Sequence, residues 1–391
     1  MQALPSQPET RRMLRFTGGF CFLFLALAWM ASWHWQGGWL YEGVGTCDLV
    51  VGRDFFQFWQ MGRAAWQPDP GRFYDFGHYL SALHGQLGAG YCEQQWSYPP
   101  SLLLFAAPFG TLPYLPALLL WSLAGPLVLM HFARRDDGLD AALVLLSPAA
   151  FFCLISGQNS FFTLALIYGG FTLRRQKPAL AGVLFGLLSL KPQLALLLPV
   201  LLIAERNWRA LGIAALTALA LVVAVWAAFG WDAWADYLTL GLPEQHDILA
   251  RPPRNIMACM VTLFMDLRAA GTGYGAAMAL QGLLALAMAV ATYRFFRARR
   301  DETWSFLFFA AASLLATPYA MGYDLLGLTL AIALVLARHR LNPTQQSLLV
   351  AGFFLPLLHY AAISFHLPGT ALLPLPIAWL AWRKGREMAE R

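Results

Sequence analysis

Residues 208–229 read WRALGIAALTALALVVAVWAAF, a stretch in which Arg209 is the only charged residue. About 20 apolar residues in helical conformation span the hydrocarbon core of a bilayer, so this stretch predicts a membrane-spanning helix. The composition of the 391-residue chain agrees, because 59% of its residues are hydrophobic and 12% are charged. A soluble domain carries roughly 25% charged residues. The sequence therefore predicts an all-α polytopic membrane protein.

Further apolar runs bring the expected number of transmembrane helices to about 12. Besides 208–229, the expected spans are 14–35, 101–132, 139–155, 160–173, 178–190, 192–204, 274–293, 304–317, 324–337, 346–365 and 370–382. Several are too short to cross straight, and broken helices at membrane depth need their free backbone groups satisfied by protein or a water-filled cavity. We expect one multipass membrane domain over 1–391. Its first run exceeds the usual apolar core of a signal peptide and is interpreted as a retained signal-anchor helix.

Small groups of basic residues separate the apolar runs and predict the orientation. They are Arg11-Arg12, Arg134-Arg135, Arg174–Lys177, Arg206 with Arg209, Arg294–Arg300, Arg338–Arg340 and Arg383–Arg386. Cytoplasmic loops carry an excess of Lys and Arg, so we place these groups and both termini in the cytoplasm. Loops 36–100 and 230–273 are then extracytoplasmic, provided that 256–270 does not cross. In an alternative topology, 179–204 is one span and 256–270 crosses.

Charge and cysteine content argue against several classes of protein. The net charge of +6 is distributed between apolar runs rather than gathered in one patch, so no nucleic-acid partner is expected. The five cysteines form no CxxC motif and no Cys/His cluster, and no metal or other cofactor is predicted. Cys47 and Cys92 share one polar loop. In an oxidising compartment they can form a disulfide, with two unpaired thiols as the alternative.

The segment 51–66, VGRDFFQFWQMGRAAW, combines a lone aspartate with an aromatic amphipathic pattern. Phe55, Phe58, Trp59 and Trp66 recur at near-helical spacing, which predicts a helix lying in the membrane interface with Asp54 at its start. Asp54 is either the N-cap of this helix or a carboxylate that takes the proton of a substrate hydroxyl.

Two further motifs lie at turns expected on the same face of the membrane. Tyr98 precedes two prolines, which are tolerated in the first turn of a helix, and its hydroxyl is a candidate ligand of a sugar. Gln158 and Asn159, in SGQNS (156–160), form a polar turn between apolar helices. Their amides either serve that turn alone or bind a sugar.

The LKPQ motif (190–193) places a lysine between two apolar runs. Such a charge is costly unless Lys191 snorkels to the surface or is paired, and an anionic phosphate is a suitable partner. Gln193 is a candidate sugar ligand. Arg251 and Arg254, in RPPRN (251–255), are further cations expected on this face and candidates for the same phosphate.

A last polar motif, TPYAMGYD (317–324), lies at another outer turn. Asp324 precedes an apolar run and is either the N-cap of the next helix or part of a second polar wall with Tyr319 and Tyr323. No metal motif accompanies this set of residues, so no metal ligand is assigned.

The order and spacing of DFFQFWQMGRAAW…FYD, YPP, SGQN, LKPQ and TPYAMGYD resemble glycosyltransferase family 87 over about residues 50–340. The resemblance implies a C-type membrane glycosyltransferase fold and a polyprenyl-phosphate-sugar donor, largely of mannose. It also implies a catalytic aspartate in the first extracytoplasmic loop, which maps onto Asp54. This residue is expected to act as general base while polyprenyl phosphate departs with inversion. Family members often carry a histidine where this chain has Tyr319.

The expected function is therefore transfer of a sugar, with mannose expected, to an acceptor glycan or glycolipid at the extracytoplasmic face of the cell (inner) membrane. Two alternatives stay open: a transporter or flippase for a lipid-linked sugar, and a non-catalytic lipid-binding assembly protein. A transporter concentrates ionisable residues and broken helices near the bilayer midplane. Here the polar motifs gather on one face instead.

Overall fold

The computed structural model describes residues 7–35, 51–89, 91, 94–134, 139–252, 254–298 and 300–387. Within these ranges the regular elements are helices, with one isolated antiparallel bridge between Met260 and Met321. Cys47 and Cys92 lie outside the described residues, as does 36–50 of the first loop. The prediction of an all-α protein is confirmed for the described part of the chain.

The elements, with η for short 3-10 or π segments, follow one another along the chain. The first half contains α1 (Gln7–Trp35), α2 (Arg53–Ala64), η2 (Pro70–Tyr74), α3 (Phe76–Leu87), α4 (Ser101–Gly110), α5 (Tyr114–Ala133), α6 (Ala141–Leu145), α7 (Pro148–Ser156), α8 (Ser160–Leu173), α9 (Pro178–Leu187), η3 (Leu188–Leu190), η4 (Pro192–Leu194) and α10 (Leu198–Ala204). The second half contains α11 (Trp208–Phe229), α12 (Asp232–Asp236), η5 (Tyr237–Gly241), α13 (Leu242–Ala250), α14 (Arg254–Cys259), α15 (Leu263–Ala269), α16 (Tyr274–Phe296), α17 (Glu302–Ala316), η6 (Gly322–Leu325), α18 (Leu326–Arg338), α19 (Pro343–Phe353), α20 (Leu355–Ser364), η7 (Thr370–Leu372) and α21 (Pro374–Glu387).

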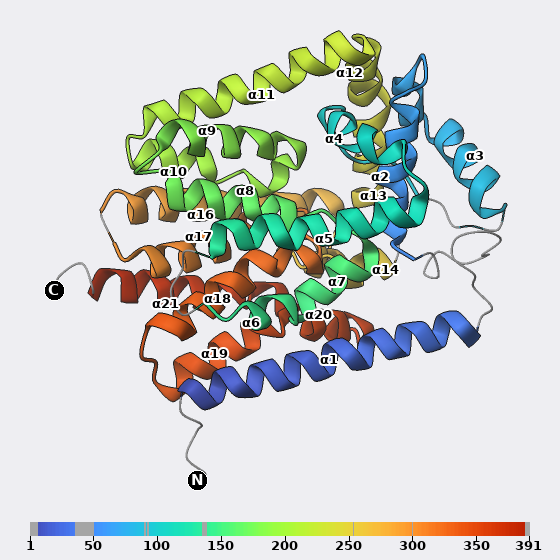
Figure 1. Ribbon diagram of the computed structural model, residues 1–391. Coiled ribbons are helices and arrows are strands. Elements are labelled where there is room, and N and C mark those ends of the chain that lie inside the picture. The colour runs from blue at the N-terminus through green and yellow to red at the C-terminus, as the bar shows by residue number, and fades with distance from the viewer. Residues whose placement is uncertain are drawn as a thin grey trace.

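The long helices lie alongside one another in a bundle, with α1 and α11 on opposite sides (Figure 1). α17 and α18 are buried over most of their length, as expected of helices that are apolar all round. The start of α1 and the end of α21 lie at one end of the bundle, and α2, α3, α12 and α13 lie toward the other (Figure 1).

The expected number of about 12 continuous spans is not confirmed. Among the described residues, α5, α11 and α16 are each long and apolar enough to cross a bilayer, and α19 with α20 forms a fourth candidate bent by 66°. Some other expected runs, such as α8 and α17, are single helices of 14 and 15 residues, and others are divided into shorter helices. Proline explains two of the breaks: Pro113 stands between α4 and α5, and Pro356 lies in the first turn of α20.

The segment 256–270 consists mainly of two short helices, α14 and α15, of six and seven residues. At 1.5 Å per residue, neither is long enough to cross the roughly 30 Å hydrocarbon core. The residues between them pair with the 317–324 loop, because Val261 N donates to Ala320 O at 2.8 Å. This segment therefore supports one wall of the polar region described below.

A network of ion pairs joins α8, α10 and α17. Arg174, after α8, is 1% exposed and donates from Nε to Glu205 at 2.9 Å and from Nη1 to Glu302 at 2.7 Å. Arg175 contacts the same two glutamates. Two carboxylates and two guanidinium groups thus neutralise one another where three chain segments meet.

We expect Arg174→Ala to lower the thermal unfolding midpoint of the purified protein, because Glu205 is nearly buried and loses a bidentate partner. Arg175 still pairs with both glutamates, so the free energy of unfolding is expected to fall by only about 2 kcal/mol, in the range of hydrogen bonds to charged groups. Arg297→Ala removes an exposed guanidinium that contacts only Tyr293 in the described part of the chain and should leave the midpoint unchanged. Equal midpoints for the two variants would contradict a stabilising role for the network.

Candidate active site

Asp54 lies in the first turn of α2, but it does not cap this helix. Gly52 occupies the N-cap position, with φ +68° and ψ 45°. Asp54 Oδ2 instead accepts a hydrogen bond from Gln158 Nε2 at 2.8 Å. The N-cap interpretation of Asp54 is therefore wrong, and its carboxylate is directed toward the turn between α7 and α8.

The aromatic side of α2 packs inside the protein. Phe55 and Phe58 are 0% and 1% exposed, and both contact the ring of Trp121 of α5, Phe58 in a stacked and Phe55 in a tilted arrangement. Trp59 is also buried and donates from Nε1 to Leu112 O at 2.9 Å. The expectation that these three rings face the membrane is therefore wrong, since the described contacts hold them against α4 and α5, whereas Trp66 is 67% exposed. Burial of these three side chains holds in place the helix that carries Asp54.

Two glycines allow the start of α2 to approach the α7–α8 turn. Gly157 ends α7 with φ +69°, and a Cβ at this position would lie 2.5 Å from Phe55 Cβ and 3.4 Å from Gly52 Cα. Gly52 also has positive φ, a conformation that glycine adopts without steric cost. The contact between Asp54 and Gln158 thus depends on two adjacent turns that both favour glycine.

We expect Gly157→Ala to lower the unfolding midpoint, because it forces α2 away from Gln158. The matched control is Gly88→Ala, which has φ +91° but no atom within 4 Å of an added Cβ. This control should lower the free energy of unfolding by only about 1 kcal/mol, the cost of a left-handed non-glycine residue. Unfolding midpoints of both variants test the prediction. Similar losses in the two would show that the close approach is unimportant.

Gln158 connects Asp54 to Tyr98. The Tyr98 hydroxyl donates to Gln158 Oε1 at 3.0 Å, and Asn159 N donates to the same oxygen at 3.3 Å. Two donors at Oε1 require the amide NH₂ group to face Asp54. Asp54 is half-buried, and in the described part of the chain no hydrogen bond reaches its second oxygen, Oδ1. This oxygen is available to a substrate hydroxyl.

Lys191 lies in the break between η3 and η4, where it forms a buried ion pair. Its Nζ is 2.6 Å from Asp324 Oδ1, and the two side chains are 2% and 0% exposed. Nζ also donates to Asn159 Oδ1 at 3.4 Å and lies 5.0 Å from the centre of the Tyr323 ring. The snorkelling alternative is therefore wrong, because Lys191 is paired inside the protein.

Asp324 is held by two further donors. Ser160 Oγ donates to Oδ1 at 2.9 Å, and Met321 N donates to Oδ2 at 3.1 Å. The second contact closes the first turn of η6, in which Met321 is the N-cap and Asp324 the third residue. Leu325 is the N-cap of α18, so the prediction that Asp324 caps the next helix is wrong. Because Asn159 and Gln158 are consecutive, the Asp54 contacts and the Lys191–Asp324 pair form one continuous polar cluster.

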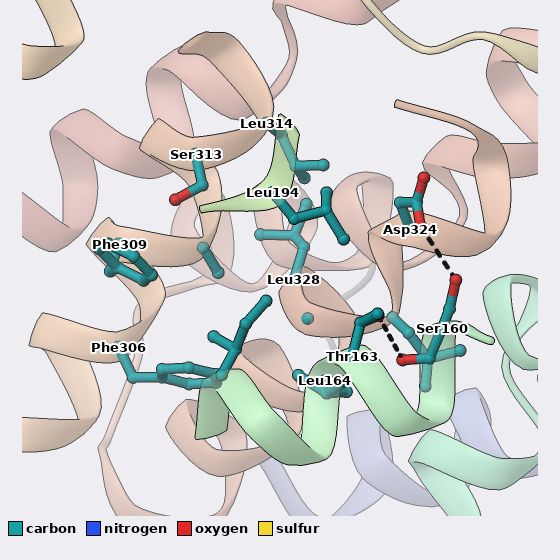
Figure 2. A pocket seen from close by; sticks show the side chains of 14 residues that line it. Ser160, Thr163, Leu164, Leu194, Phe306, Phe309, Ser313, Leu314, Asp324 and Leu328 are labelled. Carbon is teal, nitrogen blue, oxygen red and sulfur yellow. Dashed lines mark hydrogen bonds between the residues drawn. The ribbon is translucent and has the colours of Figure 1, made fainter. Parts of the chain in front are cut away.

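A narrow pocket of about 40 Å³ adjoins this cluster. Figure 2 shows Ser160 and Asp324 at one side of the pocket and the rings of Phe306 and Phe309 at the other. Leucine side chains, Leu328 among them, line much of the remainder. The pocket is polar near the ion pair and mainly apolar between α8, α17 and α18.

Tyr319 and Tyr323 lie half-buried in the loop between α17 and α18. Burial, together with the nearby negative charges of Asp324 and Asp54, raises the pKa of Tyr319 above its usual value. The phenol is therefore neutral at physiological pH, where it donates a hydrogen bond but does not accept a proton as a neutral histidine does.

The remaining predicted residues are placed differently. Gln193 is half-buried in η4, next to Lys191. Arg251 is exposed and pairs with Asp247 at 2.6 Å. Arg254 begins α14, and its side chain lies outside the described part of the structure. The recorded contacts thus join Asp54, Tyr98, Gln158, Asn159, Lys191, Tyr323 and Asp324, but not Arg251.

Ser160 is a member of the cluster that the sequence interpretation missed. It stands in the SGQNS motif directly after Asn159, and its hydroxyl contacts Asp324. A serine at the start of a helix ordinarily indicates an N-cap, so its position in the sequence did not predict the contact with Asp324. Proximity to two predicted amides was the only available signal.

A helical membrane protein with one polar cluster around a carboxylate and a buried ion pair is a candidate membrane enzyme. The model of glycosyltransferase family 87 matches residues 96–318, more than half of the chain. The chain therefore belongs to glycosyltransferase family 87. Searches of curated proteins and of solved structures found no match.

The family match includes Tyr98, Gln158 and Lys191 but ends before Asp324 and begins after Asp54. Hydrogen bonds connect these two aspartates to residues inside the matched range. As a glycosyltransferase, the protein acts on a sugar donor and an acceptor.

Proposed function

We propose that this glycosyltransferase moves mannose from a polyprenyl-phosphate donor to a glycan or glycolipid acceptor. The reaction takes place at the extracytoplasmic face of the cell (inner) membrane, with both termini cytoplasmic. The observation that carries the proposal is the arrangement of Asp54. One carboxylate oxygen is held by Gln158, the other is available to a hydroxyl, and Asn159, the residue after Gln158, contacts Lys191.

In the proposed reaction, Asp54 Oδ1 takes the proton of the acceptor hydroxyl. The acceptor oxygen then forms a bond to the anomeric carbon, while the bond from that carbon to the phosphate oxygen breaks. Polyprenyl phosphate leaves with the electron pair, and the configuration at the anomeric carbon inverts. No metal or other cofactor takes part in this proposal.

Lys191 is the proposed ligand of the donor phosphate. An ammonium group has three donors, and Asp324 and Asn159 take two of them. The third is assigned to a phosphate oxygen. Arg254 stays a candidate second cation. Arg251 is not included, because it pairs with Asp247.

The sugar itself is proposed to contact the polar residues that surround Asp54 and Lys191. Tyr98, Gln158, Asn159 and Gln193 offer hydroxyl and amide groups, and Tyr319 and Tyr323 offer a second polar wall with Asp324. Amides bind vicinal sugar hydroxyls through paired donors and acceptors.

The proposal is tested with purified protein and a panel of radiolabelled polyprenyl-phosphate sugars, with a nucleotide sugar as comparison donor. We expect label in the acceptor from polyprenyl-phosphate mannose and none from the nucleotide sugar. Transfer from the nucleotide sugar, or no transfer from any lipid-phosphate donor, would refute the proposed function.

We expect Gln158→Leu to lower kcat for transfer by about 10–100-fold, since Asp54 then loses the hydrogen bond that fixes its orientation and misplacement of a reacting group is costly. Gln86→Leu is the matched control, because Gln86 contacts only the exposed Arg63 in the described part of the chain, at 3.5 Å. Rates at saturating donor and acceptor measure the effect. A Gln158→Leu enzyme as fast as the control would show that the orientation of Asp54 does not depend on Gln158.

A further inference from the structure

A second cavity lies far from Asp54, between the start of α1 and α6. It has a volume of about 610 Å³ and is lined by Pro8, Arg12, Arg15, Phe16, Ala142 and Leu146. Volumes of about 300–1,000 Å³ are typical of sites for small ligands. The start of α1 lies at the end of the bundle opposite α2 and α3 (Figure 1), so this groove is separate from the proposed active site.

The groove has two cations and an otherwise apolar lining. Arg12 is exposed, and its guanidinium carbon lies 5.6 Å from the centre of the Phe16 ring. In the described part of the chain Arg12 forms no ion pair. Arg15 pairs with Asp140, but half of its side chain is exposed, and a guanidinium has five N–H donors. The groove therefore offers donors to an anion on a surface of net positive charge.

An apolar stripe continues from the groove along α1. Phe16, Phe20, Leu23 and Leu27 are 67%, 69%, 59% and 54% exposed, and their spacing places them on one helical face. A helix of 29 residues is about 44 Å long at 1.5 Å per residue, longer than the roughly 30 Å hydrocarbon core. We place α1 across the bilayer, as the sequence predicts for 14–35, so that Arg12 and Arg15 lie at the depth of lipid headgroups and the stripe lies at the depth of acyl chains.

We propose that this groove binds an anionic phospholipid. Its phosphate is bound by Arg12 and by the exposed N–H groups of Arg15, and its acyl chains lie along Phe16 and the stripe on α1. Basic pockets between transmembrane helices are known binding places for anionic headgroups. A free phosphate ion is the poorer occupant, because four of the six lining residues are apolar.

The test uses native mass spectrometry to measure the binding of phosphatidylglycerol to the full-length protein in detergent. We expect Arg12→Ala to weaken binding about fivefold, the effect of one juxtamembrane arginine. Ala142→Phe fills the groove without changing charge and should also weaken binding. The control is Arg297→Ala, which removes an equally exposed arginine that lies over the ring of Tyr293, four residues before it, and should bind normally.

Three results would overturn the proposal. The first is phosphatidylglycerol binding by folded Arg12→Ala that equals binding by Arg297→Ala. The second is equal binding of phosphatidylcholine, and the third is displacement of phosphatidylglycerol by inorganic phosphate at the same concentration. Elution as a single monodisperse species shows that each variant is folded. If Ala142→Phe does not fold, Arg12→Ala still tests the proposal, because Arg12 is exposed.

Discussion

Asp54→Asn is expected to leave the protein folded and to lower sugar transfer by about 10²–10⁴-fold, the usual contribution of a positioned general base. The asparagine has nearly the same shape, and its oxygen can still accept from Gln158 Nε2, so α2 keeps its place. The amide, however, does not take the proton of an acceptor hydroxyl. The measurement is the initial rate of label transfer from polyprenyl-phosphate mannose.

Asp75→Asn provides the control for this substitution. Asp75 lies in the same segment between α1 and α4 and caps α3 by accepting from His78 N at 2.7 Å, a role that asparagine also fills. This variant should transfer sugar at the wild-type rate. A wild-type rate of transfer by Asp54→Asn would instead show that Asp54 is not the general base.

The second large effect concerns the Lys191–Asp324 pair. Lys191→Met and Asp324→Asn each leave one buried charge without its partner, and such changes cost about 3–5 kcal/mol. We expect both single variants to unfold at clearly lower temperature than wild type. The double variant Lys191→Met/Asp324→Asn should regain much of this loss, because the introduced asparagine can still accept from Ser160 and no unpaired charge is left.

The double variant also separates two roles of Lys191. If Lys191 binds the donor phosphate, the regained stability of the double variant will not restore activity, and KM for the lipid donor will stay raised. If the pair only stabilises the fold, transfer will recover together with the unfolding midpoint. Recovery of both would contradict the phosphate role.

Some helix bounds could be predicted from the sequence because local chemistry sets them. The expected spans 160–173 and 208–229 coincide with α8 and α11. Asn207 caps α11 by accepting from Ala210 N, which gives this helix a sharp start. The divided runs were harder to predict, since hydropathy reports an apolar environment but not whether one helix continues through it.

The contacts of the site could be predicted only in part. The motifs around Asp54, Gln158, Lys191 and Asp324 were recognisable from charged or amide residues at apolar turns. Their pairing was not, because Asp54 and Gln158 are 104 residues apart and Lys191 and Asp324 are 133 apart. Helical spacing likewise does not tell whether the aromatic face of α2 contacts lipid or protein, and here it contacts protein.

In the proposed mechanism a single carboxylate, Asp54, serves as the base of a direct displacement. This mechanism is tested by the anomeric configuration of the glycosidic bond that the wild-type enzyme forms from a polyprenyl-phosphate sugar of known configuration, determined by NMR. We predict inversion. Retained configuration would contradict the mechanism, since attack of the acceptor opposite the leaving group inverts the anomeric carbon.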